Sequence, residues 1–150
     1  MKKTSILVLI IFILLIAIGF MIYNEFANAN SFQVGDTQFV LPEGYHVGIL
    51  NRNGDVNITN GTNSLFFAEH NGTDINHYVQ GYSEYKLKNN RTITIENFTI
   101  DGKFVCKATN SNNNTARYFF INNNKVYSIY NWDYNNKLDE TVSELIKTAN

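Results

Sequence analysis

The feature that most constrains this chain is an uninterrupted apolar run near its N-terminus, residues 6–23. Lys2 and Lys3 precede the run, and the first charge after it is Glu25. At about 1.5 Å per residue the run makes a helix of roughly 27 Å, close to the hydrocarbon thickness of a bilayer. In lipid the backbone must satisfy its own polar groups, as a helix does. We therefore predict a transmembrane anchor over residues 1–23, with residues 5–23 in contact with membrane lipid.

The flanking charges predict how this anchor is oriented. Positive flanks stay on the cytoplasmic side, so we expect a single-pass protein of the cell membrane with a cytoplasmic N-terminus, a linker over residues 24–31 and a domain over residues 32–150 outside. The alternative is a cleaved signal peptide, because Ala27, Asn28 and Ala29 form an A-x-A-like site. A secretory apolar core is usually about 7–15 residues long, which favours the retained anchor.

Residues 32–150 are enough for one domain with a core and too few for two. Without the two N-terminal lysines the outer part has 10 basic and 13 acidic residues, a net charge of −3. The basic residues are scattered singly, so we expect no nucleic-acid partner. The single cysteine, Cys106, permits no internal disulfide and alternates with Phe104 and Ala108, as a strand core residue does.

Turn signals between short alternating runs predict an antiparallel sheet. The dipeptides Asn53-Gly54, Asn60-Gly61 and Asp101-Gly102 supply the positive φ that tight hairpins need. Together with the asparagine run 122–124, they separate strands predicted over residues 45–50, 55–59, 64–69, 97–100, 103–109, 117–121 and 125–132.

Two of these strand predictions include an assignment of faces. Around Asp101-Gly102 we expect Phe98 to share a face with Phe104 and Cys106. In the last strand, successive residues point to opposite faces of the sheet, and apolar or aromatic residues occur on both faces. This pattern predicts that both faces of the strand are at least partly covered.

Two amphipathic stretches predict helices over residues 75–88 and 138–149. In the first, Thr73 or Asp74 provides the N-cap, and Asn89 and Asn90 end the helix in a left-handed turn. In the second, apolar residues form a stripe at helical spacing: Leu138, Val142, Leu145, Ile146 and Ala149. The order of elements predicts an α+β fold in which helices pack on an antiparallel β-sheet.

Several motifs resemble those of a known superfamily. Residues 39–45 read F-V-L-P-E-G-Y, like the opening F-x-[IL]-P-x-G-[WYF] of PsbP-like domains; I-D-G-K follows at 100–103 and R-Y-F-F-I-N-N-N-K-V-Y-S-I at 117–129. Over residues 36–149 the chain resembles the Mog1/PsbP superfamily. The resemblance implies an α/β/α sandwich behind one membrane helix, as in small archaeal or bacterial surface proteins. It implies binding rather than a reaction, and no ligand residue carries over.

One cluster in the sequence has the residue types of a metal site: Glu69, His70, Asp74 and His77. Two imidazoles and two carboxylates can bind a divalent ion, provided that the Asn71-Gly72 turn folds them together. The competing interpretation is a pair of surface histidines beside a loop. No motif of a hydrolase, phosphate loop or complete EF-hand is present, so we expect no cofactor and no catalytic residue.

A second candidate site is aromatic. Tyr78, Tyr82 and Tyr85 on the first predicted helix, with Trp132 after the last strand, offer stacking surfaces to a sugar or a peptide. The competing interpretation is that these tyrosines are the half-buried side of a helix that lies on a sheet.

The exported location also makes N-x-[ST] sequons relevant. The chain has 24 asparagines and six sequons, at Asn57, Asn60, Asn71, Asn90, Asn97 and Asn113. We thus expect a membrane-anchored extracytoplasmic protein, open to N-glycosylation, with a non-catalytic binding or accessory role toward a protein or cell-envelope partner. The alternative is a small cell-surface hydrolase or metal-dependent enzyme, and an intermediate possibility is a subunit of a larger membrane complex.

Overall fold

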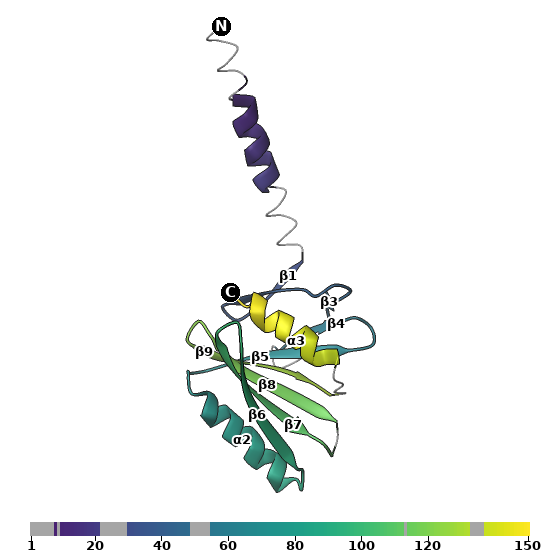
Figure 1. Cartoon of the computed structure of the whole chain (residues 1–150). Coiled ribbons are helices and arrows are strands. Elements are labelled where there is room, and N and C mark those ends of the chain that lie inside the picture. Colours follow the sequence, from purple (N-terminus) through teal and green to yellow (C-terminus); the bar gives the residue numbers. More distant parts are fainter. Residues whose placement is uncertain (1–7, 9, 22–29, 49–54, 113, 133–136) are drawn as a thin grey trace. The chain divides into compact units, whose positions relative to one another are not determined.

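The structure is a computed structural model that describes residues 8, 10–21, 30–48, 55–112, 114–132 and 137–150 (Figure 1). The chain divides into two compact units, Met1–Ser31 and Phe32–Asn150. In the first unit, residue 8 and residues 10–21 are helical. Among the described residues, no helix has both the length and the apolar character needed to cross a membrane. The predicted anchor, residues 1–23, lies partly outside the described residues.

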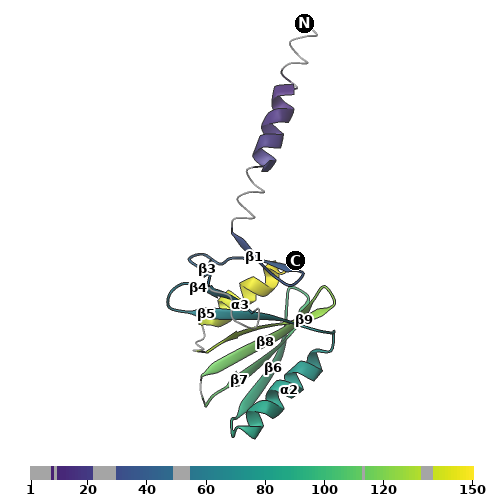
Figure 2. The ribbon, with the colours of Figure 1, turned by 180° about the vertical axis from the view of Figure 1, so that it is seen from behind.

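The second unit is built on a seven-stranded antiparallel sheet (Figures 1 and 2). From one edge to the other its strands are β3 (His46–Val47), β4 (Val56–Thr59), β5 (Ser64–His70), β9 (Lys125–Asn131), β8 (Thr115–Asn122), β7 (Lys103–Asn110) and β6 (Ile93–Ile100). The predicted α+β class with an antiparallel sheet is therefore confirmed. The strand predicted over residues 45–50 is shorter, and residues 49–54, with the predicted Asn53-Gly54 turn, lie outside the described residues.

One helix covers each face of this sheet. Helix α3 (Lys137–Thr148) and the two-stranded hairpin of β1 (Ser31–Val34) and β2 (Thr37–Val40) pack on one face, where Phe39, Phe120 and Leu145 are buried. Helix α2 (Ile75–Lys88) packs on the other face (Figure 2). Beneath it lies a smaller cluster that includes Val79 and Cys106. Both faces of β9 are buried, as predicted, because the strand lies in the middle of the sheet between these two layers.

Two of the predicted hairpin turns have the backbone that their residues favour. Asp101 and Gly102 lie at φ +47° and +76°, and Asn123 and Asn124 at +48° and +58°. Two consecutive positive φ values match the right-handed twist of the flanking strands. Gly and Asn adopt positive φ with the least conformational strain. In the turn between β4 and β5, Asn60 Oδ1 accepts hydrogen bonds from two backbone N–H groups.

The predicted faces around Asp101-Gly102 are wrong. A two-residue turn pairs Ile100 with Lys103, and it therefore pairs Phe98 with Val105 and Asn97 with Cys106. Cross-strand partners point to the same face. Phe98 consequently faces α3 with Val105, whereas Cys106 faces α2 and is buried there, as predicted for a core residue.

The helix predicted over residues 75–88 has the bounds of α2. Asp74 is its N-cap, since Asp74 Oδ1 accepts from the N–H groups of Asn76 at 3.0 Å and His77 at 3.3 Å. Asn90, at φ +55°, provides the left-handed residue after its C-terminus. The second helix begins one residue earlier than predicted, at Lys137, and ends at Thr148.

The hairpin of β1 and β2 was not predicted. Ser31, placed in the linker, already belongs to β1. The hairpin joins the end of the chain, because Gln38 and Asn150 exchange two backbone hydrogen bonds of 3.0 Å. The N–H of Val40 donates to Thr148 Oγ1 at 3.2 Å.

Glu69 of β5 holds the turn of this hairpin. Its carboxylate accepts from Asp36 N at 3.1 Å, Lys125 Nζ at 2.8 Å and the Tyr127 hydroxyl at 3.0 Å. The hydrogen bond from Lys125 is the main reason that the pKa of Glu69 is lowered. Gly35, at φ +56°, lies so close that a Cβ there would stand 1.4 Å from Glu69 Oε2. Only glycine fits this position without displacing the carboxylate.

Candidate binding site

A cleft of about 340 Å³ opens between the C-terminal half of α2 and the neighbouring ends of β8 and β9. We call it the α2 cleft. Its aromatic walls are Tyr82, Tyr85, Tyr130 and Trp132, and three cationic side chains, Lys86, Arg91 and Arg117, also line it. Large rings beside several positive charges are suited to a ligand with both a flat face and a negative charge.

Local structure places most of these residues. Tyr82, Tyr85 and Lys86 stand at positions i, i+3 and i+4 of α2, so they share one helix face. Arg117 and Tyr130 are direct cross-strand partners of β8 and β9. Arg91 lies beside the C-terminal end of α2, because its N–H donates to Lys86 O at 3.1 Å.

The cations lie over the faces of the rings. Arg117 Cζ is 4.2 Å from the centroid of the Tyr130 ring and 5.1 Å from that of Tyr82. Lys86 Nζ is 5.0 Å from the centroid of Tyr82 and 5.6 Å from that of Tyr85. Contacts of this kind stabilise a cation by about 0.5–2 kcal/mol, and they hold it while leaving its N–H groups able to donate.

No ion pair to a described carboxylate balances Lys86, Arg91 or Arg117; the ion pairs of the described residues involve Lys107 and Lys125. The carboxylate of Asp55 accepts from the Tyr130 hydroxyl at 2.9 Å. Burial lowers the pKa of Lys86, and Arg91 and Arg117 lower it further. Burial also lowers the pKa of Arg117, although Tyr82, Tyr130 and the carboxylate of Asp55 oppose this shift. The α2 cleft therefore holds mutually repelling positive charges that an anion would relieve.

Tyrosine titration follows from the same environment. The pKa of Tyr130 is raised to about 12, first by burial and then by its hydrogen bond to Asp55. Burial also raises the pKa of Tyr82, although Arg117 opposes that shift. Both hydroxyls therefore remain protonated near neutral pH and add no negative charge to the cleft.

The structure brings three of the four predicted aromatic residues together. Tyr82, Tyr85 and Trp132 line the α2 cleft. Tyr85 and Trp132 are each 62% exposed, so both rings present accessible surface to a ligand. Tyr82 is half-buried, with its ring centroid 6.0 Å from that of Phe119, as the competing core interpretation expects. Tyr78 lies in an adjoining hollow, and its hydroxyl donates to the carbonyl of Asn71.

The four metal candidates do not share a site. Glu69 holds the β1–β2 turn, whereas His70, the next residue of β5, points to the α2 face, where its Nε2 lies 2.9 Å from Ser128 Oγ. Asp74 is occupied as the N-cap of α2, and His77 packs edge-on against Tyr78. Within the described part of the chain, no group of three His, Cys, Asp or Glu side chains is arranged to hold a metal ion.

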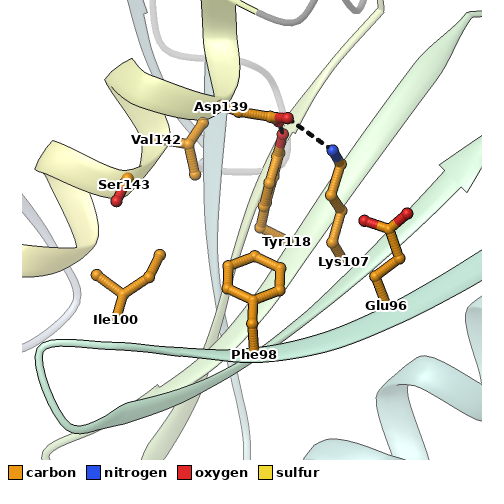
Figure 3. Close-up of a pocket in the computed structure, with 8 residues that line it drawn as sticks. All are labelled: Glu96, Phe98, Ile100, Lys107, Tyr118, Asp139, Val142 and Ser143. Atoms are coloured by element: carbon orange, nitrogen blue, oxygen red, sulfur yellow. Dashed lines mark hydrogen bonds and ion pairs between the residues drawn. The ribbon is translucent and has the colours of Figure 1, made fainter.

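A second hollow, of about 290 Å³, lies between α3 and the edge of the sheet (Figure 3). We call it the α3 pocket. Asp139 of α3 accepts a hydrogen bond from the Tyr118 hydroxyl and forms a 2.8 Å ion pair with Lys107, which is 7% exposed (Figure 3). These charges are already matched, so the contacts attach α3 to β7 and β8. Phe98 and Ile100 of β6 form the apolar side of the pocket.

Five of the six sequons lie in described parts of the chain. Asn57 is partly buried in β4, and four others have exposed side chains: Asn60, Asn71, Asn90 and Asn97. Asn113 lies outside the described residues.

The cationic half of the α2 cleft was missed by sequence reasoning. One signal was available, since a two-residue turn at Asn123-Asn124 places Arg117 opposite Tyr130. The spacing of Tyr82 and Lys86 along α2 was another. Neither signal shows that α2 lies across β8 with its C-terminus beside Arg117, which requires long-range packing.

The fold and the cleft together define an antiparallel α+β domain with a helix on each face and one cationic, aromatic cleft. No family model matches the sequence, and no curated protein is significantly similar to it. The functional conclusion therefore rests on the chemistry of the α2 cleft.

Proposed function

We propose that this chain is a single-pass membrane protein whose PsbP-like α+β domain acts outside the cell as a non-catalytic binding module, and that its α2 cleft binds an acidic sugar. The apolar run 6–23 supports the anchor. A sheet with a helix on each face, and a turn with Gly44 at φ +80° after the buried Phe39, are compatible with the PsbP-like motif.

The observation that carries the proposal is the group of three cations without a described ion-pair partner. Lys86 is only 6% exposed; among the described residues it lies over two tyrosine rings and forms no ion pair. A buried cation without a counter-ion is unfavourable for folding alone. A bound carboxylate or sulfate would supply the missing charge, with each charge-assisted hydrogen bond contributing about 1.5–3 kcal/mol.

The aromatic walls favour a sugar over a small inorganic anion. Tyr85 and Trp132 both present exposed rings in the cleft lining, one from α2 and one from the residue after β9. Such rings combine an apolar face with a polar edge, which matches the apolar face and hydroxyl rim of a pyranose. A sugar that carries a carboxylate uses both the rings and the cations.

A binding measurement on the full chain in mild detergent tests this proposal. The probes are hyaluronan oligosaccharides, which carry glucuronate, and neutral dextran oligosaccharides of the same length. We expect calorimetry to show binding of the acidic probe, weaker binding of the neutral one, and loss of affinity as salt increases. Arg91→Gln removes one charge-assisted contact and should weaken binding about tenfold.

Lys147→Gln is the matched control, because this exposed lysine lies on α3, across the sheet from the cleft. Its affinity should equal that of the unmodified chain. Trp132→Ala should weaken both the acidic and the neutral probe, since it removes only a stacking surface. Equal affinity for the two probes, or equal effects of Arg91→Gln and Lys147→Gln, would show that the cations do not select the ligand.

A further inference from the structure

Strand β6 forms an open edge of the sheet. It has eight residues, whereas β3 at the opposite edge has only two. Among the described strands, β6 pairs with β7 alone (Figures 1 and 2). Its residues 94–99 are all exposed. Natural sheets usually keep edge strands short, covered or charged, so a long open edge marks a surface on which another strand can pair.

The hairpin register identifies which backbone groups face outward. Because a two-residue turn closes the β6–β7 hairpin, Ile100 and Lys103 form its first hydrogen-bonded pair. Hydrogen-bonded and non-hydrogen-bonded pairs then alternate along the strands. The residues of β6 in the non-hydrogen-bonded pairs are Ile93, Ile95, Asn97 and Thr99. Their N–H and C=O groups point away from β7. This row of donors and acceptors is complementary to another β-strand and not to a helix.

The side chains of β6 provide little of the usual protection against such pairing. The strand has no proline, its register with β7 contains no bulge, and Glu96 is its one charged residue. Ile95 is 46% exposed, and Phe98 is 36% exposed beside the α3 pocket. Apolar side chains thus lie beside unpaired backbone groups along the same edge.

We propose that β6 pairs antiparallel with β6 of a second copy of this chain, so that the two sheets become continuous. The two-fold axis of such a pair is perpendicular to the sheet, and it places outward-facing residues opposite one another. We call a residue the centre of the pair if the two-fold axis places it opposite its own copy. A pair centred on Glu96 would bring two carboxylates together, which is unfavourable. Centres at Ile95 or Asn97 avoid this repulsion and still pair three outward-facing residues of each copy.

A second copy fits this edge better than an unrelated strand for two reasons. Each β6 carries one carboxylate, and both allowed centres place it opposite an uncharged residue, Thr94 or Phe98. Two copies anchored in one membrane would also meet at a high effective concentration, a contribution that rests on the proposed anchor. A glycan on Asn97 would occupy this edge, so the pairing is expected of protein that is unmodified there.

Cysteine cross-linking of the unglycosylated full chain in mild detergent tests the pairing and its centre. The variants are built on Cys106→Ala, because Cys106 lies opposite Asn97 within its own chain and would capture a new thiol there. Ile95→Cys or Asn97→Cys should form a covalent dimer on oxidation, since one of these residues faces its own copy. Thr99→Cys is the control, because at either centre its partner is a different residue.

Ile95→Lys in the otherwise unmodified chain tests the edge without a cysteine. It places two ammonium groups in the pair, so light scattering should show a monomer where the unmodified chain shows a concentration-dependent dimer. Leu87→Lys, at an exposed apolar position of α2, should leave the dimer intact. The proposal is overturned if the unmodified chain is monomeric, if its dimer survives Ile95→Lys, or if Thr99→Cys cross-links as well as both test positions.

Discussion

At the scale of single residues, His70 shows how burial controls a titratable group in this domain. Its ring lies under α2, with its centroid 4.7 Å from that of Tyr78, and its Nε2 contacts Ser128 Oγ. Burial lowers its pKa from 6.5; the positive charge of Arg117 adds to this, and Asp55 opposes it. The neutral ring is therefore the form that suits the folded state.

This shift predicts how stability depends on pH. The unfolded chain takes up a proton near pH 6.5, whereas the folded chain resists protonation until a lower pH. Folding stability from this group is thus complete above pH 6.5 and is lost as the pH falls toward the lowered pKa. We expect His70→Gln to lose less unfolding free energy than the unmodified chain between about pH 7 and 5, as measured by urea denaturation.

His46→Gln is the comparison for this measurement, because His46 is exposed on β3. Its denaturation curves should follow those of the unmodified chain at each pH. If His70→Gln and the unmodified chain lose the same free energy over this range, His70 is not the group responsible.

At the scale of elements, an apolar stripe and polar contacts, among them an ion pair, attach α3 to the sheet. Val142, Leu145 and Ile146 are fully buried against the sheet. Asp139 in the first turn pairs with the buried Lys107, and its negative charge also suits the N-terminal end of the helix dipole. The ion pair therefore helps to hold α3 on the sheet and compensates the charge of the buried Lys107.

We expect Asp139→Ala to destabilise the domain by about 1–3 kcal/mol, because it removes the carboxylate that forms an ion pair with the buried Lys107 ammonium. The measurement is the free energy of unfolding by urea. The lower half of that range is favoured, since the Asp139 side chain is 39% exposed and partly screened by water.

The double variant Lys107→Met with Asp139→Leu separates the pair from its surroundings. Replacing both partners by apolar residues should recover much of the lost stability, because no unpaired charge remains. A double variant as unstable as the sum of the single variants would mean that the two residues do not act as a pair.

At the scale of the whole molecule, the proposed location of the domain rests on the N-terminal apolar run. Helical residues such as Phe12 and Met21 expose most of their apolar surface, at 62% and 68%. Side chains of this kind are stable in lipid or against another apolar surface. We expect native protein to fractionate with membranes and to begin at Met1 or Lys2, as determined by N-terminal mass analysis. Soluble protein that begins near Asn30 would instead indicate cleavage after Ala29.

Local elements were predictable because their causes are local. Asp74 caps α2, and Asp101-Gly102 and Asn123-Asn124 form turns, through conformational preferences of the residues themselves. The β1–β2 hairpin was missed because its turn is held by Glu69, which comes 33 residues after Asp36. The face of Phe98 was predicted wrongly because a two-residue turn places Phe98 opposite Val105, and not opposite Cys106.

The sequence by itself determined the apolar N-terminal run, the α+β class, the helix over 75–88 and three of the four aromatic residues of the candidate site; Tyr130 was not predicted. Each follows from periodicity or composition within one stretch of chain. Only the tertiary structure decided that Lys86, Arg91 and Arg117 share the α2 cleft, that Glu69 and His70 lie on opposite faces, and that β6 is left at the edge. These arrangements depend on how helices and strands distant in the chain pack, because burial of apolar surface acts without regard to sequence separation.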